Sequence, residues 1–284
     1  MLLFLSLLFS GTLRERSFRT EAAMEKLSVY MITYNEEERL ARTLEAVVRF
    51  ADEIVIVDSG STDRTKEIAE KYGARFVYHE WKNFSAQKRF AQNLCENRWV
   101  MNLDADEVPD AAMTAQLNAL KQKFTADAYK VCVKDVFPGW KKPRKLARRF
   151  NIIRLYNRDF MDMPDDFSND RPVFIRKDVR VGQLKGLIYH YSYVNLTQLI
   201  DKWNKYSSEF MKTAQGKKKH YSTVRIFTEF PVQFLRYYFI RRYIFCGFYG
   251  LVTALTSAYF RFVKLAKFRE EEILRKEKNN RDAS

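Results

Sequence analysis

The chain has 284 residues, of which 46% are hydrophobic and 15% aromatic, a composition that excludes a disordered protein and suits one sizeable α/β domain with an appendage. A formal net charge of +15 predicts an anionic partner, such as nucleic acid, an anionic membrane surface or a phosphorylated substrate. The cysteines Cys95, Cys132 and Cys246 lie far apart, which argues against a disulfide framework or a zinc site and is typical of a reducing compartment.

The N-terminal segment reads MLLFLSLLF over residues 1–9, an apolar run too short to cross a bilayer as a helix. Arg14, Arg16 and Arg19 follow this run, whereas a signal peptide carries its positive charge before the apolar region. Met24 lies just before the first predicted strand. We therefore expect residues 1–23 to be an N-terminal extension or a weak membrane-touching tail, outside the fold.

Short apolar runs alternate with helical patterns over residues 27–133. The predicted strands are Leu27–Thr33, Glu53–Val57, Arg75–Tyr78 and Trp99–Leu103. The predicted helices are Glu36–Phe50, a helix that ends at Tyr72 and is capped by Thr62 or Asp63, and Phe84–Cys95. Strands that alternate with helices imply crossover connections, and hence an α/β fold with a mainly parallel central sheet flanked by helices.

Three of these strands end in polar clusters, namely Thr33–Glu36, Asp58–Asp63 and Asp104–Glu107. Ligands of such sheets bind beyond the carboxyl ends of the strands, near the point where the strand order reverses. The clusters therefore predict one ligand site at this edge of the sheet.

Asp104 and Asp106 form the sharpest of these signals. Two carboxylates, one residue apart at a strand end, can both reach a hard cation or its bound waters. Such a cation neutralises charge that develops on a departing diphosphate. An acidic pair by itself is more often part of a solvated loop, but the strand Trp99–Leu103 that leads into it and the earlier strand end at Asp58 favour a metal site.

Four segments in this order, SVYMITYNEE, IVIVDSGSTDRT, SAQKR and WVMNLDADE, resemble the family 2 inverting glycosyltransferases of the GT-A (nucleotide-diphospho-sugar transferase) fold. Within that family the chain is most similar to the bacterial lipopolysaccharide-core β-glucosyltransferase branch. The similarity is clear over residues 27–110 and looser to residue 215. It implies sugar transfer from a nucleotide-diphosphate donor, with inversion and with Mg²⁺ or Mn²⁺ as cofactor.

The resemblance also implies a nucleotide pocket. Asp58 would contact the base, normally uracil, and Gln87 and Lys88 would approach the pocket from the third helix. Lys88 suits a diphosphate as a point charge, although a solvated helix lysine is the more common case. The segment expected to border the pocket consists of Thr33, Tyr34, Asn35 and Glu36, with Asn35 also a candidate helix cap.

The metal and the sugar are expected near three further side chains. The resemblance places Asp104 at the sugar or ribose and Asp106 at the metal with the diphosphate, and both are candidate metal ligands. His190, in the segment LIYHYSY, matches a histidine placed similarly in relatives and would approach the diphosphate or the metal. A purely structural role is as frequent for such a histidine.

An inverting transfer needs a general base that deprotonates the acceptor hydroxyl. Relatives often carry a His-Glu pair where this chain reads Asp170-Arg171-Pro172-Val173, so the sequence departs from the family here. The nearby carboxylates Asp165, Asp166 and Asp170 are the candidate catalytic bases, and each is also typical of a solvated loop. The departure is consistent with a changed acceptor or a weak enzyme.

The C-terminal part of the chain is basic and aromatic. We expect a GT-A catalytic domain over residues 24–215 and a helical segment over residues 216–284. Tyr243–Phe260 carries no charge over about the minimum length of a membrane span and has basic flanks. Polar and glycine residues dilute its apolarity, which argues against a transmembrane span. The aromatic and basic character of the segment favours a helix at the membrane interface, attracted to anionic lipid, over a core helix packed on the catalytic domain.

The leading functional hypothesis is transfer from a UDP-sugar to a lipid-linked saccharide such as a lipopolysaccharide core, by a cytoplasmic protein bound peripherally to the inner face of the cytoplasmic membrane. A second is transfer to a polyprenyl phosphate, an acceptor that is already an anion and needs less base assistance. A third is a catalytically weak nucleotide-sugar-binding protein. Nucleic acid is not an expected partner, because the basic residues follow no recognisable nucleic-acid-binding fold.

Overall fold

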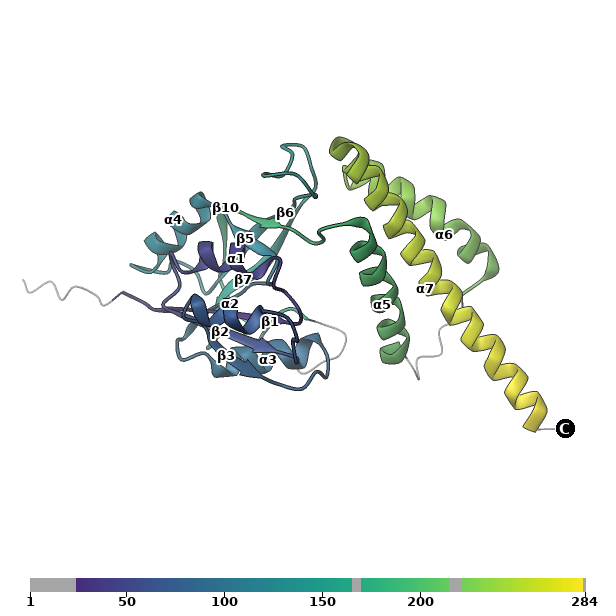
Figure 1. Cartoon of the computed structure of the whole chain (residues 1–284), viewed down its shortest axis with the longest axis horizontal. Coiled ribbons are helices and arrows are strands. Elements are labelled where there is room, and N and C mark those ends of the chain that lie inside the picture. The colour runs from purple at the N-terminus through teal and green to yellow at the C-terminus, as the bar shows by residue number, and fades with distance from the viewer. Residues whose placement is uncertain (1–23, 165–169, 215–220, 283–284) are drawn as a thin grey trace, which may run out of the picture.

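The computed structural model describes residues 24–164, 170–214 and 221–282. A body of sheet and helices lies beside a group of long C-terminal helices (Figure 1). The predicted extension over residues 1–23 falls outside the described residues.

A large mixed sheet forms the centre of the body. Its strands are β1 (Leu27–Thr33), β2 (Glu53–Asp58), β3 (Arg75–Tyr78), β4 (Trp99–Asn102), β5 (Glu107–Pro109), β6 (Ala128–Asp135), β7 (Arg149–Asn157) and β10 (Val181–His190). The order across the sheet is β3-β2-β1-β4-β7-β6-β10-β5. The strands from β3 to β4 run parallel, β7 is antiparallel to β4 and β6, and β10 is parallel to β6 and antiparallel to β5. A small separate sheet pairs β8 (Met161–Asp162) with β9 (Val173–Phe174).

Helices cover both faces of this sheet, as the sequence pattern predicts. They are α1 (Leu40–Val47), α2 (Thr65–Lys71), α3 (Phe84–Leu94) and α4 (Ala111–Leu120). Alternate side chains of a strand point to opposite faces. Val29 and Met31 therefore pack with Leu44 of α1 in one core cluster, whereas Tyr30 packs with Ala91 of α3 in another.

Two predicted helix starts are wrong. Helix α1 begins at Leu40 and not at Glu36, because Asn35 adopts a left-handed conformation with φ of 53° and a turn precedes the helix. Asn35 is therefore not its cap. Helix α2 begins at Thr65 with Arg64 at the cap position, one residue after Asp63. Asp63 still binds this first turn, because its Oδ1 accepts a hydrogen bond from the Thr65 N–H at 3.0 Å.

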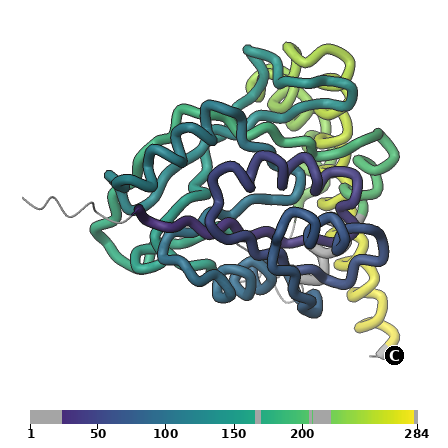
Figure 2. Tube along the Cα trace, turned by 60° about the vertical axis from the view of Figure 1, so that its left-hand side comes forward, coloured from purple at the N-terminus to yellow at the C-terminus, as the bar shows by residue number. Residues whose placement is uncertain are grey.

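The C-terminal group consists of α5 (Leu196–Ala214), α6 (Thr223–Leu235), a π-helical turn η1 (Arg236–Ile240), a 3₁₀ turn η2 (Tyr243–Cys246) and the long α7 (Gly247–Asp282). In Figures 1 and 2 this group lies along one side of the body. Arg261 of α7 donates to Glu229 of α6 at 3.0 Å, and Lys267 of α7 donates to Ser207 of α5 at 2.8 Å. The helices are thus joined by polar contacts as well as by packing.

An aromatic cluster connects the C-terminal group with the body. Phe137, which follows β6, packs with Tyr193, Leu199, Tyr243 and Cys246. All of these side chains are buried. The C-terminal helices therefore pack against the body where β6 ends and are not a detached appendage.

One helical segment in the described part of the chain, Tyr243–Arg281, is long and apolar enough to cross a membrane, and 39% of its apolar window is buried in the protein. Core helices of soluble proteins meet the same criterion, so no span is assigned. Helix α7 turns Ala254 and Ala258 inward. Apolar side chains stay exposed at helical spacing on α7 (Phe248, Leu251, Leu255, Tyr259) and on α6 and η1 (Val224, Phe227, Leu235, Phe239). We call these eight residues the apolar face.

Candidate functional site

A cavity of about 1160 Å³ lies where the carboxyl ends of β1, β4, β6 and β10 meet the C-terminal helices. The sheet side supplies residues that the sequence singled out, namely Glu36, Lys88, Asp104, Asp106, Asp170 and His190. The helical side supplies Leu199, Lys202, Trp203, Tyr237, Arg241 and Tyr243. The predicted edge of the sheet is therefore the edge that carries the cavity.

Asp104 is held between two cations at the end of β4. Lys88 Nζ lies 3.1 Å from Oδ1, and Arg154 donates to Oδ2 at 2.8 Å. Burial acts to raise the pKa of Asp104, but Arg154 and Lys88 outweigh it and hold that pKa well below the usual range. The Lys88 side chain is only 2% exposed, so the common case of a solvated helix lysine does not apply.

Arg154 ties the end of β4 to β7. Its guanidinium donates to Asn102 Oδ1 at 2.8 Å and to a carboxylate oxygen of Glu107 at 2.5 Å, besides Asp104. Burial raises the pKa of Glu107, against the opposing charge of Arg154. The backbone N–H of Asp104 also donates to Glu107 at 3.2 Å. This network fixes the turn that aims Asp106 into the cavity.

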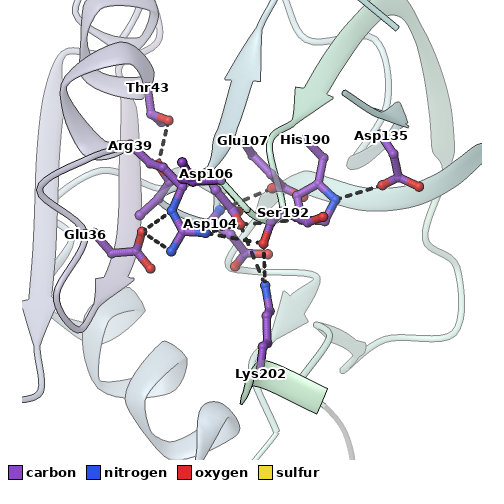
Figure 3. A network of polar contacts seen from close by, with 12 residues as sticks. Glu36, Arg39, Thr43, Asp104, Asp106, Glu107, Asp135, His190, Ser192 and Lys202 are labelled. Atoms are coloured by element: carbon purple, nitrogen blue, oxygen red, sulfur yellow. Dashed lines mark hydrogen bonds and ion pairs between the residues drawn. The ribbon is translucent and has the colours of Figure 1, made fainter. Parts of the chain in front are cut away.

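Asp106 faces a different set of cations (Figure 3). Its Oδ2 lies 3.6 Å from Arg39 Nη1, 3.6 Å from His190 Nε2 and 3.9 Å from Lys202 Nζ. The main chain on each side of it is anchored, because Ala105 O accepts from Thr43 at 2.7 Å and Asp106 O accepts from the Tyr191 N–H at 2.9 Å. Asp106 is thus preorganised toward positively charged groups.

His190 is oriented by a second carboxylate. Its Nδ1 lies 3.0 Å from Asp135 Oδ1, and the other oxygen of Asp135 accepts a hydrogen bond from the Tyr243 hydroxyl at 2.9 Å. Burial acts to lower the pKa of His190, but Asp106 and Asp135 outweigh it and raise the pKa to about 9. The Nε2 edge is therefore directed at Asp106 by contacts that begin on the C-terminal helices.

Glu36 closes the site on the β1 side. It pairs with Arg39, whose Nη2 lies 2.7 Å from Oε2. Burial raises the pKa of Glu36 to about 7, against the opposing charge of Arg39. This carboxyl group therefore titrates near neutrality beside Asp106.

Asp58 and Thr33 lie outside the cavity wall. Asp58 is buried at the end of β2, where Oδ1 accepts from the backbone N–H groups of Gly60 at 2.8 Å and Ser61 at 2.7 Å. Its Oδ2 accepts from the Thr33 hydroxyl at 2.7 Å. Both side chains therefore hold the loop after β2 in shape, and contact of Asp58 with a base stays a prediction.

Gln87, Tyr34 and Asn35 also lie away from the cavity wall. Gln87 is buried and donates to Ser59 Oγ at 3.0 Å, at the same loop after β2. Asn35 binds that loop too, since its Oδ1 accepts from the Thr62 N–H at 2.9 Å. The Tyr34 side chain is half exposed. These residues shape the border of the site, while their contact with a nucleotide stays a prediction.

The candidate bases are only partly described. Asp165 and Asp166 lie outside the described residues. Asp170 lines the cavity, where its Oδ2 lies 3.4 Å from Lys88 Nζ. Asp170 shares Lys88 with Asp104, and more than half of its side-chain surface is exposed.

Sequence reasoning missed several residues that complete the site. Arg154 carries a signal, since it is a lone charge within the apolar strand segment IIRLY. Asp135 carries another, because it ends strand β6 as Asp58 ends β2. Arg39, Lys202 and Tyr243 give no comparable signal, because only the tertiary fold brings them to Asp106 and Asp135.

The donor groups at the site fit a divalent metal that shares its coordination with a ligand. No group of three or more His, Cys, Asp or Glu side chains within the described residues could hold a metal by itself. Asp106 and His190, however, converge on the cavity wall, and Asp135 fixes the histidine ring as outer-shell carboxylates do at metal sites. Magnesium commonly takes one or two protein ligands and completes its shell with phosphates and water.

The chain is similar to known proteins over most of its length. Residues 28–183 match the family described as glycosyl transferase family 2. An uncharacterized glycosyltransferase of Rickettsia typhi is 37% identical over 257 residues, which cover 87% of this chain and 88% of that protein. The lipopolysaccharide core biosynthesis glycosyltransferase LpsC of Rhizobium meliloti is 32% identical over 266 residues, covering 90% of this chain and 97% of that protein. A crystal structure of S. aureus TarS 1-349 aligns with a TM-score of 0.42 and 14% identity, covering 87% of this chain and 92% of that one.

Proposed function

Because this chain belongs to glycosyltransferase family 2, we propose that it transfers a sugar from a UDP-sugar to a lipid-linked saccharide, such as a lipopolysaccharide core, with inversion at the anomeric carbon. The observation that carries the proposal is the convergence of Asp104, Asp106, Lys88 and His190 on one cavity beyond the strand ends. The similarity to LpsC, which extends over 90% of this chain, supports a lipopolysaccharide core as the acceptor.

The donor diphosphate would lie between Lys88 and the Asp106 side of the cavity. Lys88 and Lys202 both line the cavity, and each supplies a compact positive charge that suits phosphate oxygens. Asp104, already fixed by Arg154, would accept from a sugar or ribose hydroxyl. The segment Thr33–Glu36 and the loop held by Asp58 would border the nucleoside.

Mg²⁺ or Mn²⁺ is the cofactor of this proposal. Asp106 and His190 would hold the ion together with the diphosphate, and bound there it would neutralise charge on the leaving group. Asp104 remains a candidate ligand, although both of its oxygens are paired with Lys88 and Arg154.

The transfer itself is a single displacement. The acceptor hydroxyl oxygen bonds to the anomeric carbon, the bond from that carbon to the diphosphate breaks, and the hydroxyl proton passes to a carboxylate base. Asp170 is the described candidate for this base because it lines the cavity, and Asp165 and Asp166 lie close to it in sequence.

The apolar face supports a peripheral position on the cytoplasmic membrane, at its inner face. Arg236 and Arg242 are exposed and adjoin this face, on η1 and in the turn that follows it. Exposed apolar and basic side chains on one helix group are typical of proteins that lie at an anionic lipid surface. Such a position would bring the cavity to an acceptor embedded in the membrane.

A polyprenyl phosphate is the second candidate acceptor. It is favoured by the absence of the His-Glu pair at residues 170–173, because an anionic acceptor needs less help from a base. Incubation of a membrane lipid extract with radiolabelled donor separates the two, since a polyprenyl product and a glycosylated saccharide differ in size.

Calorimetric titration of UDP, with and without Mn²⁺, tests the donor site. We expect binding that needs the metal and is lost in Asp106→Ala. Asp159→Ala, which removes an exposed partner of Arg98, is the matched control and should bind UDP as the wild type does. Absence of UDP binding by the wild type under both conditions would contradict the proposed function.

A further inference from the structure

The cavity continues beyond the carboxylates to a second wall. This wall is formed by Arg148, just before β7, together with Tyr237, Arg241 and Tyr243 from the C-terminal helices. We call these four residues the arginine wall. Asp106 contacts His190, His190 contacts Asp135, and Asp135 contacts Tyr243. Tyr243 is the last residue of this series, so the arginine wall lies at its opposite end from Asp106.

Both arginines of this wall are stacked on aromatic rings. The guanidinium carbon of Arg241 lies 4.3 Å from the centre of the Tyr237 ring, and that of Arg148 lies 5.0 Å from the centre of the Phe150 ring. A guanidinium stacked on its face keeps its N–H groups in the plane, where they can bind a carboxylate or a phosphate with two parallel hydrogen bonds. These contacts with aromatic rings leave the positive charge of both side chains in place.

Arg148 neighbours Tyr243 directly, whereas Arg241 is linked to Tyr243 through Tyr237. The rings of Tyr237 and Tyr243 are stacked with centres 6.2 Å apart, which links Arg241 to Tyr243. Burial and Asp135 raise the pKa of the Tyr243 hydroxyl, and the neighbouring Arg148 opposes this rise. Both arginines thus belong to one wall and are not separate surface charges.

Asp135, the acidic residue near this wall, already has partners for both of its carboxylate oxygens. Asp135 lines the same cavity, but one of its oxygens is bound to His190 and the other to Tyr243. Among the ion pairs of the described residues, none within 4.0 Å joins Arg148 or Arg241 to a carboxylate, although the charge of Arg148 helps to lower the pKa of Asp135. Two half-buried cations on a cavity wall, with the local acid occupied, leave the wall suited to an external anion.

We propose that the arginine wall binds an anionic group of the acceptor, a phosphate or a carboxylate carried near the hydroxyl that receives the sugar. This inference rests on the proposed function and specifies its acceptor class as anionic. The donor diphosphate is matched by Lys88 and by the groups around Asp106, so a second pair of cations serves a second anion.

The test compares a charged probe with a neutral one in protein saturated with UDP and Mg²⁺. We expect calorimetry to detect binding of mannose 6-phosphate and none of mannose. Arg148→Gln and Arg241→Gln should each weaken binding of mannose 6-phosphate at least tenfold, and Arg241→Gln should leave UDP affinity unchanged. Arg144→Gln is the matched control, because Arg144 stacks on Trp140 at 4.9 Å but does not line the cavity.

A second arm distinguishes the two sources of the anion. Polyprenyl phosphate in neutral phosphatidylcholine vesicles replaces the sugar phosphate, and binding that depends on Arg148 and Arg241 in this arm alone assigns the wall to a lipid phosphate. The inference would be overturned if mannose and mannose 6-phosphate bound with equal affinity and neither substitution changed binding to the vesicles. In that case, UDP binding by the wild type would still support the proposed function. Failure of the wild type to bind UDP contradicts the proposed function instead, and the same titrations without UDP still test the wall.

Discussion

The hydroxyl of Tyr243 donates a hydrogen bond to Asp135 at 2.9 Å, although 108 residues separate the two in the chain. The other carboxylate oxygen of Asp135 pairs with His190, whose opposite edge faces Asp106. One carboxylate therefore connects the turn before α7 with the edge of the sheet that carries the cavity. The C-terminal helices help to set the geometry of the site as well as covering it.

Tyr243→Phe tests this connection. It leaves one oxygen of a largely buried carboxylate without its donor, so we expect a loss of about 1–2 kcal/mol in the free energy of unfolding. The His190 ring loses part of its support, and metal-dependent affinity for UDP should fall several-fold. Chemical denaturation and calorimetry measure the two effects. Tyr259→Phe, at an exposed position on α7, should change neither, and wild-type UDP affinity in Tyr243→Phe would contradict the connection.

His190 predicts how metal binding depends on pH. Its pKa is raised to about 9, so the ring is protonated at pH 7 and must lose a proton before it can bind a cation. Metal-dependent UDP affinity should therefore increase from pH 7 to pH 9, by at most about tenfold per pH unit. His190→Gln should abolish this increase. A wild-type affinity that is flat or falls over this range would contradict the assignment of His190 to the metal.

The same shift affects stability in the opposite direction. Because the folded-state pKa lies above the ordinary value of 6.5, protonated His190 stabilises the fold fully below that value, and this contribution is lost as pH rises through about 9. The free energy of unfolding without metal should therefore fall over this interval in the wild type. The difference between wild type and His190→Gln should shrink in parallel.

A comparison of Lys88→Met with Lys66→Met tests whether the ion pair of Lys88 contributes more to stability than an exposed ion pair does. Removal of the ammonium leaves Asp104 with Arg154 alone. Because Asp104 keeps this partner and is 36% exposed, we expect a cost of about 1–2 kcal/mol of stability. UDP binding should also be lost. Lys66→Met, which breaks the exposed pair with Glu70, should cost less than about 1 kcal/mol. Equal stabilities of the two variants would show that Lys88 is not held as described.

Local pattern was sufficient to predict the strands that lead to the site. Apolar runs bounded by turn residues placed β1 to β4 within a residue or so of their observed ends, and Asp104 and Asp106 follow directly from the end of β4. The start of α1 was missed because the left-handed backbone at Asn35 delays the helix. A helical pattern alone carries no information on that conformation.

The groups that surround the carboxylates could not be predicted in the same way. Arg154 reaches Asp104 through the antiparallel pairing of β4 with β7, and Lys202 reaches Asp106 from α5. Both contacts depend on which elements become neighbours, which neither periodicity nor propensity specifies. The proposed sugar-nucleotide roles of Asp58 and Gln87 came from family resemblance and remain predictions.

The apolar face predicts binding to lipid. Phe227→Asp and Phe248→Asp place charges on exposed positions of α6 and α7, and each should weaken sedimentation with anionic vesicles about tenfold. Added salt should weaken wild-type binding further, because basic residues contribute to attraction. Tyr78→Asp, at an exposed aromatic position on β3, is the control. Vesicle binding that survives both substitutions would rule out the apolar face as the contact.

The cations around Asp106 have a consequence for the order in which ligands assemble. A bare divalent ion that approaches this carboxylate meets the positive charges of Arg39 and Lys202, and that of protonated His190, all within 4 Å of Oδ2. A metal already chelated by a nucleoside diphosphate carries a net negative charge and is attracted by the same groups. Metal and nucleotide should accordingly enter as one complex, and their affinities should be strongly and reciprocally coupled.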